Sequence, residues 1–356
     1  MVTLRRSISN LERLRDIGAE RTEKILLDKN ERIAAFPDEF IESLRCLIDS
    51  ESITKYPDQT ELYQALSKFL GLEADQLLLV NGSDSGIKTI FEAAVHPGDI
   101  ICHLEPTYAM AGVYANMFDC HSRQIKFDYS LQLTVEDLSS YIEPDIKLVY
   151  LANPNQPTGT CFRTSELEVI LGKAVETGTL VIVDEAYIEF SETKGALPLL
   201  AEFSNVCVLR TFSKAWGMAG LRLGYIVANP ALIVQFAKTR SLLDINSIAL
   251  NAAKLLIDQN SIVQDYVAEV LEGKRFIKEF CKKNEIEFVN TRTNFAFIRI
   301  PERKNTKSVV RKIANGGFRV KCVEGTSTVL DGCIRFTIGP VKQAQIFANS
   351  VLRALQ

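Results

Sequence analysis

A lysine in the middle of this 356-residue chain lies where covalent chemistry is feasible. Lys214 follows the apolar run 206–209 and lies in the stretch TFSKAWGMAGLRLGY, among small and apolar residues. Burial among such neighbours lowers the pKa of a lysine amine and makes it a nucleophile toward carbonyl groups. Ser213 and Arg222 flank it, and both residue types suit a phosphate. The alternative interpretation is a solvated cation in a structural loop.

A carboxylate and a hydroxyl follow another apolar run, 180–183. Asp184 ends that run in the stretch VIVDEAY, and Tyr187 comes three residues later. A buried carboxylate needs a partner because an isolated buried charge is costly. A protonated ring nitrogen would be such a partner, and Tyr187 could bond an oxygen on the same ring. Asp184 could equally be the N-cap of a helix.

A third polar group precedes the helical pattern 87–94. The loop Asn81–Gly86 contains Ser83 and Asp84 and follows the apolar run 77–80. Small residues at a helix N-terminus present free backbone N–H groups to an anion, so a strand, such a loop and a helix can form a phosphate site. The loop matches neither the dinucleotide pattern nor the Walker pattern. It could also be an ordinary Gly- and Ser-rich turn.

Two further segments place polar or aromatic groups after apolar runs, and one arginine lies within a later run. Residues 153–159 read NPNQPTG, a loop whose two prolines predict a rigid backbone. Tyr108 follows the run 100–103 and could stack on a planar ring or pack in the core. Arg335, in a later apolar run, suits bidentate capture of a carboxylate or phosphate, with a surface salt bridge as the alternative.

The elements that must position these residues form a regular pattern. Short apolar runs at 77–80, 100–103, 148–151, 180–183, 206–209 and 225–227 alternate with helical patterns. This alternation predicts an α/β fold with a mostly parallel sheet between helices, whose ligands gather at the carboxyl ends of the strands. Each of the segments above follows one of these runs, apart from Arg335.

The pattern changes after about residue 232. One long helical stretch is predicted over 232–280, followed by strands at 287–289, 295–300 and 334–338, a helix at 306–315 and a last helix from about 341. We therefore expect an N-terminal arm over 1–45 that packs on the small domain, a large domain over 46–235, and a small α+β domain over 236–356.

Composition excludes several classes of protein. The formal charge of −3 gives no reason to expect nucleic acid as a partner. No run of about 18 apolar residues and no apolar signal core occurs, so we expect no membrane contact and a cytoplasmic protein. None of the eight cysteines forms a CxxC pair, and the three histidines lack metal-ligand spacing. We expect reduced thiols and no metal site.

VIVDEAYIEF, LRTFSKAWGMAGLRLGY and NPNQPTG together resemble the class I and II aminotransferases, which are fold-type I pyridoxal-phosphate (PLP) enzymes, and within them the histidinol-phosphate aminotransferase group. The resemblance covers roughly residues 25–340. It implies that Lys214 forms the Schiff base with PLP and moves the proton at the substrate's α-carbon, while Asp184 pairs with the ring nitrogen and Tyr187 with the ring oxygen. It also implies a homodimer with shared active sites. The remaining implied roles are contacts to the cofactor phosphate by Ser83, Asp84, Ser213, Arg222 and, from the neighbouring subunit, Tyr56; ring stacking by Tyr108; and substrate binding by Arg335 and Asn30.

The departures from the family pattern lie mostly on the substrate side. Gln156 replaces the Asn whose amide usually contacts the ring oxygen of PLP, which leaves that contact altered or lost. Lys321 stands where phosphate-selecting relatives usually have Arg, and Arg32 stands near a substrate-facing position. Residues 243–246 also differ from the usual Pro-Tyr-Asn. We expect retained PLP chemistry with an amino acid donor such as glutamate, and a small phosphorylated or carboxylated substrate other than histidinol phosphate.

Two other functions remain open from the sequence. One is a PLP-dependent decarboxylase of a phosphorylated amino acid, similar to threonine-phosphate decarboxylase, since a decarboxylase branch resembles this same group; the lysine motif here is more similar to that of transaminases. A PLP-binding regulatory module fused to a DNA reader is disfavoured, because no extra basic domain precedes or follows the core.

Overall fold

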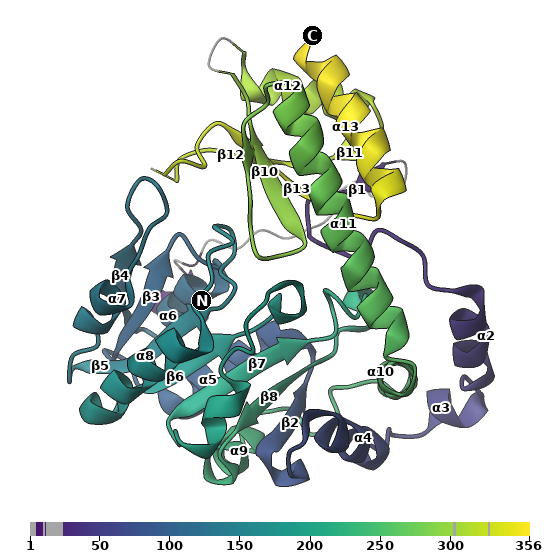
Figure 1. The fold of residues 1–356 in the computed structure, drawn as a ribbon. Helices are drawn as coiled ribbons and strands as arrows, with labels where there is room; N and C mark the ends of the chain where they lie inside the picture. Colours follow the sequence, from purple (N-terminus) through teal and green to yellow (C-terminus); the bar gives the residue numbers. More distant parts are fainter. Residues whose placement is uncertain (1–4, 10, 12–23, 302–303, 327) are drawn as a thin grey trace.

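The apolar runs form a seven-stranded sheet in the order β2-β8-β7-β6-β5-β3-β4 (Figure 1). The computed structural model describes residues 5–9, 11, 24–301, 304–326 and 328–356. The pairs from β7 through β4 are parallel, and β8 runs antiparallel to both of its neighbours, which confirms the mostly parallel sheet. The strands are β2 (Leu77–Val80), β3 (Ile100–Glu105), β4 (His121–Lys126), β5 (Ile146–Ala152), β6 (Leu180–Asp184), β7 (Val206–Thr211) and β8 (Gly224–Ala228).

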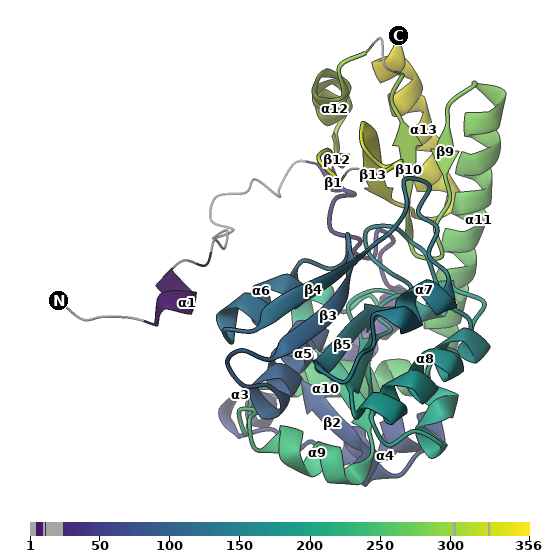
Figure 2. The same cartoon turned by 90° about the vertical axis from the view of Figure 1, so that its left-hand side faces the viewer.

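Helices cover both faces of this sheet because both faces are apolar. Successive strand residues point to opposite faces, so Leu78 packs in one core and Leu79 in the other. Figure 2 shows α6 and α8 on opposite sides of β3 and β5. One face is covered by α5 (Gly82–Ala94), α6 (Met110–Met117) and α9 (Pro230–Ala237). The other is covered by α4 (Thr60–Leu70), α7 (Val135–Ser140), α8 (Thr164–Thr177) and α10 (Ser247–Asp258).

The second, smaller part is an antiparallel sheet in the order β12-β13-β10-β9 that packs against helices (Figure 1). Its core includes the rings of Phe336 and Phe347, whose centroids lie 4.6 Å apart. The predicted strands and helices from residue 287 onward are confirmed. The elements are β9 (Phe288–Val289), β10 (Phe295–Arg299), β12 (Lys321–Val323), β13 (Cys333–Thr337), α11 (Ser261–Lys283), α12 (Thr306–Asn315) and α13 (Val341–Leu355).

The prediction of one long helical stretch over 232–280 is wrong, because the chain breaks into α9, α10 and α11. Asn246 starts α10 as its N-cap, with its side chain accepting a hydrogen bond of 2.8 Å from the backbone N–H of Ala249. The helical period alone did not reveal this cap. The unbroken α11 runs alongside both parts of the molecule (Figure 1).

The described part of the N-terminal segment contacts both parts. Strand β1 (Ile25–Leu26) pairs with β11 (Phe318–Arg319) of the small part, whereas α2 (Asp38–Cys46) packs against α10. Much of the predicted arm, residues 1–4, 10 and 12–23, lies outside the described residues. The three domain boundaries therefore stay predictions. The remaining short elements are α1 (Arg6–Ser9), α3 (Ser50–Thr54), η1 (Ala74–Gln76), η2 (Ile188–Phe190), η3 (Leu197–Ala201) and η4 (Ala219–Leu221).

Strand β4 and the three short strands of the N-terminal and C-terminal segments, β1, β11 and β12, were not predicted. In β4 only Ile125 is buried, because the strand lies at the edge of the sheet and has no continuous apolar run. Within the described residues, no helix is both long and apolar enough to cross a membrane. All eight cysteines are free thiols.

Candidate active site

A cavity of about 240 Å³ opens where β5, β6 and β7 end, close to the N-terminus of α5. The residues that line it come from segments far apart in the sequence, as expected at the carboxyl edge of an open parallel sheet. Nine predicted site residues line the cavity: Ser83, Asp84, Tyr108, Gln156, Asp184, Tyr187, Ser213, Lys214 and Arg222. Five do not: Asn30, Arg32, Tyr56, Lys321 and Arg335. Lys29, Glu31 and Thr211, which were not predicted, also line it.

Lys214 is half-buried, with its amine directed across the cavity. Its Nζ donates a hydrogen bond of 2.9 Å to the backbone carbonyl of Lys29 and lies 5.5 Å from the centre of the Tyr187 ring. The loop is held from behind by packing of Phe212 on Trp216, whose ring centroids are 5.0 Å apart. Trp216 in turn donates through Nε1 to Glu189 at 3.0 Å. The amine therefore has a fixed place next to the other polar groups.

Asp184 is buried at the end of β6, with only 4% of its surface exposed. Its Oδ2 accepts a hydrogen bond of 2.7 Å from the Tyr150 hydroxyl, and its Oδ1 accepts one of 3.1 Å from the Ala186 N–H. Burial raises the pKa of the Asp184 carboxyl to about 6, since these hydrogen bonds only partly offset the loss of water. A cationic group in the cavity would supply the missing charge. The bond to the Ala186 N–H resembles that of a helix N-cap, but the next helical element, η2, begins only at Ile188.

Tyr150 is a site residue that the sequence reasoning missed. It belongs to β5, and its side chain is fully buried. A buried tyrosine hydroxyl needs a hydrogen-bond partner. The one tyrosine in the otherwise apolar run LVYLA, residues 148–152, was the available signal.

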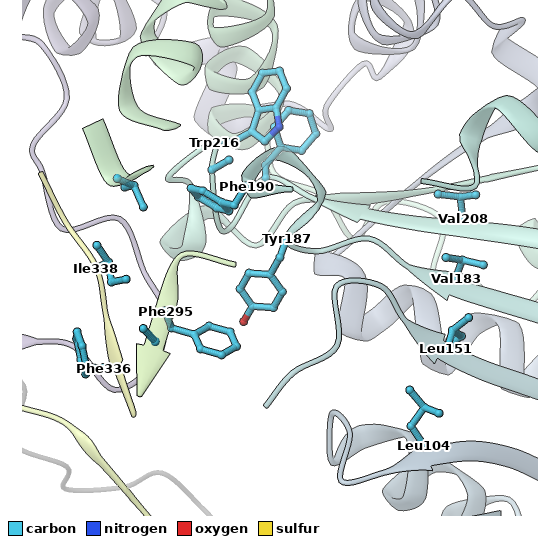
Figure 3. Close-up of a cluster of buried hydrophobic side chains, with 14 of the residues drawn as sticks. Leu104, Leu151, Val183, Tyr187, Phe190, Val208, Trp216, Phe295, Phe336 and Ile338 are labelled. Atoms are coloured by element: carbon cyan, nitrogen blue, oxygen red, sulfur yellow. The ribbon is translucent and has the colours of Figure 1, made fainter. Parts of the chain in front are cut away.

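Tyr187 lies at the junction of the two parts of the molecule. Its ring packs edge-on against Phe295 of β10, with centroids 5.5 Å apart (Figure 3). Its hydroxyl accepts a hydrogen bond of 2.9 Å from Asn30 Nδ2, which leaves the hydroxyl proton for an oxygen acceptor. Asn30 is 2% exposed and is itself fixed, because its backbone N–H bonds Thr337 Oγ1 at 3.1 Å.

An anion site is formed where the first turn of α5 meets the loop after β7. Arg222 adopts a left-handed backbone with φ 56°, and its Nη1 approaches Ser213 Oγ at 3.4 Å. Ser213 Oγ also accepts a bond of 3.0 Å from Thr211. Gly82 has φ +74°, and a Cβ atom there would lie only 2.5 Å from Arg222 Nη2. Backbone N–H groups, a hydroxyl and a guanidinium thus converge as a phosphate requires.

The loop 153–159 is held by two asparagines whose role the sequence reasoning did not foresee. Asn155 Nδ2 donates to the Pro106 carbonyl at 3.0 Å, and Asn155 Oδ1 accepts from Thr107 Oγ1 at 2.6 Å. The Asn153 side chain bonds both backbone groups of Phe162. Its Nδ2 donates to the Phe162 carbonyl at 3.0 Å, and its Oδ1 accepts from the Phe162 N–H at 2.7 Å. These bonds join the loop to the segment that carries Tyr108. Gln156 is half-buried and points along the cavity wall.

The four residues predicted for substrate binding, Asn30, Arg32, Lys321 and Arg335, lie outside the cavity wall. Arg335 is 9% exposed, donates to the Asp28 carbonyl at 2.8 Å, and lies 5.4 Å from the centre of the Phe295 ring. Its Nε has no hydrogen-bond partner among the described residues. Lys321 is exposed on β12, directly across the ladder from Arg335.

Arg32 was expected near the substrate, but its side chain packs on two aromatic rings and does not line the cavity. The Arg32 guanidinium carbon lies 4.4 Å from the centre of the Phe36 ring and 4.0 Å from that of Tyr266. Such cation–π packing satisfies the charge outside the cavity. Burial lowers the pKa of this guanidinium, which stays protonated at neutral pH.

The residues present fit PLP. The cofactor has an aldehyde, a basic ring nitrogen, a phenolic oxygen and a phosphate. The cavity is lined by a lysine amine, a buried carboxylate with no cationic partner in the described part of the chain, a tyrosine hydroxyl that accepts a bond and retains its proton, and an anion site. Among the described residues no cluster of His, Cys, Asp or Glu could hold a metal ion.

Comparisons with known proteins agree with this fit. The family described as aminotransferase class I and II matches residues 22–351. The chain is 30% identical to a histidinol-phosphate aminotransferase of Thermoanaerobacter pseudethanolicus over 336 residues, 92% of each chain. It is 31% identical to histidinol-phosphate aminotransferase 2 of Bacillus thuringiensis over 271 residues, 75% of this chain and 73% of that one.

Solved structures share the fold. The histidinol-phosphate aminotransferase of Sinorhizobium meliloti, in complex with pyridoxal-5′-phosphate, superposes with a TM-score of 0.88 at 22% identity and covers 100% of this chain and 98% of that one. Aspartate aminotransferase of Thermus thermophilus with maleate gives 0.82 at 17% identity, covering 100% and 99%. The chain belongs to the class I and II aminotransferases and is a PLP-dependent transaminase of fold type I.

Proposed function

We propose that the cavity residues divide the work of amino transfer as the sequence resemblance implies. When bound, PLP supplies an aldehyde for the amino group and a ring that withdraws electrons. Lys214 Nζ binds the cofactor covalently and later carries the proton removed from the substrate's α-carbon. Lys214 and Tyr187 both line the cavity, with Nζ 5.5 Å from the centre of the Tyr187 ring, which supports a place for the amine close to the residue that would hold the ring oxygen.

Asp184 and Tyr187 would each hold one polar atom of the ring. Asp184 holds the proton on the ring nitrogen, and Tyr150 orients the carboxylate for it through the 2.7 Å bond. Tyr187 donates its remaining proton to the ring oxygen, with Asn30 fixing the hydroxyl. The observation that carries the proposal is the buried Asp184 carboxylate, which has no cationic partner among the described residues and lines the same cavity as the Lys214 amine and the Ser213–Arg222 anion site.

Gly82→Ala tests the phosphate role of Arg222. A methyl group would displace the guanidinium, so we expect PLP to bind about 10- to 100-fold more weakly through loss of a charge-assisted bond. Gly178→Ala is the matched control, since Gly178 has φ +71° but no atom within 4 Å of an added Cβ. Equal PLP affinities of the two variants, measured by titration, would show that Arg222 does not hold the phosphate.

The substrate is proposed to be a small amine or ketone that carries a carboxylate or phosphate, with glutamate as the amino donor. Arg335 supports an anionic substrate, because its buried Nε has no partner in the described protein and its guanidinium lies beside Phe295 and Tyr187. The aminotransferase relatives favour amino transfer over decarboxylation. The preferred substrate is proposed to differ from histidinol phosphate, because Arg32 and Lys321 differ from the residues that the family usually has at these positions.

A half-reaction screen tests the substrate. The PLP-loaded enzyme is mixed with glutamate, aspartate, histidinol phosphate and neutral amines, and the conversion of PLP to pyridoxamine phosphate is followed by absorbance. We expect anionic donors to react and Arg335→Gln to raise their KM. A neutral amine as the best substrate would contradict the anionic pocket, and histidinol phosphate at the highest kcat/KM would contradict a different substrate.

The chain is further proposed to form a homodimer with shared active sites. Tyr56 does not line the cavity and is 85% exposed, which is unusual for a tyrosine in a single subunit. A neighbouring subunit that receives Tyr56 at its phosphate site would account for this exposure. The cytoplasmic location also stays a prediction.

Subunit complementation tests this arrangement. Tyr56→Ala and Lys214→Ala subunits, each inactive or weak as pure dimers, are mixed and reassociated. If Tyr56 serves the other subunit's site, each hybrid dimer has one intact site, so random mixing is expected to restore about one quarter of wild-type activity. No recovery in verified hybrid dimers would place Tyr56 in its own subunit's chemistry or in none.

A further inference from the structure

A lysine on α11, outside the cavity, is buried without a carboxylate. Lys274 is 7% exposed, and its Nζ donates to the backbone carbonyls of Thr291, at 3.0 Å, and of Thr293. None of the ion pairs found among the described residues includes it. A buried cation is costly, so one that binds only carbonyls fixes the backbone at a price in stability.

The position of Lys274 along α11 is itself fixed. A Cβ atom on the preceding residue, Gly273, would lie 2.0 Å from the carbonyl oxygen of Gly339. The helix backbone therefore touches the chain between β13 and α13 and cannot slide past it. The Lys274 ammonium group therefore extends from a fixed position on α11 to the segment 290–294, between β9 and β10. We refer to this segment as the 290–294 turn.

One side of the 290–294 turn holds the loop that carries Gln156. The Arg292 N–H donates to the Gly159 carbonyl at 3.0 Å. Gly159 has φ +73°, and a Cβ atom there would lie 2.2 Å from Thr291 Cβ, so the two segments are in direct contact. Gly159 closes the loop 153–159, and its own N–H bonds the Asn155 carbonyl at 2.7 Å. A shift of the turn would shift this loop.

The other side of the turn holds the Tyr187 hydroxyl. Asn294 Nδ2 donates to the Asn30 carbonyl at 3.1 Å, and Asn30 Nδ2 donates to the Tyr187 hydroxyl at 2.9 Å. The next residue, Phe295, packs edge-on against the Tyr187 ring (Figure 3). Three successive contacts thus connect the ammonium of Lys274 to the hydroxyl that faces the cofactor.

We propose that Lys274 is a positioning residue for amino transfer, which fixes the 290–294 turn and through it both the Gln156 loop and the Tyr187 hydroxyl. The inference rests on the proposed contact of Tyr187 with the ring oxygen of PLP. Two carbonyls two residues apart accept hydrogen bonds from one nitrogen, which fixes the curvature of the turn. An apolar side chain of similar length, such as Met, lacks these donors, and the two carbonyls then lose this partner.

The test compares Lys274→Met with Lys274→Arg in the PLP-loaded enzyme, with Lys278→Met as control because Lys278 is exposed on the next turn of α11. We expect Lys274→Met to move the absorption maximum of bound PLP and to lower kcat about 10- to 100-fold, as small displacements of reacting groups do. Lys274→Arg, which keeps the donors, is expected to restore part of kcat, and Lys278→Met to match wild type. If Lys274→Met does not fold, Lys274→Gln replaces it; its amide donor group is one atom closer to the backbone than Lys274 Nζ, so we expect a smaller change in the same direction.

Two results would overturn the proposal. One is a folded Lys274→Met or Lys274→Gln enzyme with wild-type absorption and kcat. The other is a variant with a lower melting temperature but unchanged absorption and kcat, which would show that Lys274 contributes only to stability. Tyr187→Phe tests the contact of Tyr187 with the cofactor separately from the role of Lys274. A spectral change in Tyr187→Phe alone rejects Lys274 as a positioning residue, whereas no change in Tyr187→Phe rejects the Tyr187 contact on which it rests.

Discussion

Lys214→Ala is expected to lower kcat by about four orders of magnitude, the upper range for loss of a positioned proton-transfer group, with the covalent step lost in addition. The same change removes the hydrogen bond of 2.9 Å to the Lys29 carbonyl, so the loss has a structural component as well. Lys214→Arg separates the two. It keeps a cation and a donor for that carbonyl but cannot bind the cofactor covalently.

The measurement is covalent retention of PLP after reduction with borohydride, together with steady-state rates. We expect wild type to retain PLP on Lys214 and neither variant to retain any. Lys29 is the informative control, because it also lines the cavity. Lys29→Ala is expected to keep the covalent cofactor. If Lys214→Ala still carried PLP, and lost it only on further replacement of Lys29, the assignment of the nucleophile would be wrong.

Asp184→Asn is expected to have opposite effects on the protein stripped of PLP and on the loaded enzyme. Burial raises the pKa of Asp184 from 3.8 to about 6 in the folded protein without PLP. The folded state therefore binds the proton more tightly than the unfolded state, and the stability contributed by this group falls as pH rises from about 4 to 6. At pH 7 the cost is about 3 kcal/mol, at 1.36 kcal/mol per pKa unit.

Asparagine removes this cost, since its amide can still bond Tyr150 and the Ala186 N–H. We expect Asp184→Asn without PLP to be more stable than wild type at pH 7, by up to about 3 kcal/mol, and equal to it near pH 4. With PLP, the neutral amide no longer holds the proton on the ring nitrogen. We expect kcat to fall about 1,000-fold, the scale for loss of a preorganised charge.

Denaturant melts of the PLP-free protein at pH 4 and 7 measure the stability effect, and steady-state rates of the PLP-loaded enzyme measure the effect on kcat. Asp265→Asn is the control, because Asp265 is exposed on α11 and its replacement removes the same charge. An Asp184→Asn protein that is less stable than wild type at pH 7 without PLP would contradict an uncompensated carboxylate. A PLP-loaded variant with wild-type kcat would remove Asp184 from the reaction.

The large sheet was predictable because its signal is local. The runs that become β2, β3, β5, β6, β7 and β8 are apolar on both faces, and residues within a few positions determine this. The edge strand β4 was missed for the same reason, since it is polar on the face that stays exposed. The break between α9 and α10 depends on the cap at Asn246, a single side chain inside a helical period.

Nine of the cavity residues were predictable from the sequence, because each ends or follows a strand of the large sheet, and parallel strands end on the same edge of a sheet. Lys29, Glu31 and Thr211 were not predicted. Only the tertiary structure decided which groups meet. Tyr150 bonds Asp184 across neighbouring strands, Arg32 packs on the rings of Phe36 and Tyr266, and Lys274 holds the turn against Gly159. Tyr150 and Asp184 are 34 positions apart, and Arg32 and Tyr266, like Gly159 and Thr291, are farther apart still, so no periodicity or motif encodes these pairings. The contacts of Lys274 with Thr291 and of Arg32 with Phe36 span fewer positions but also follow no helical or strand period. Burial and the requirement that every buried polar group be satisfied select these partners once the chain has folded.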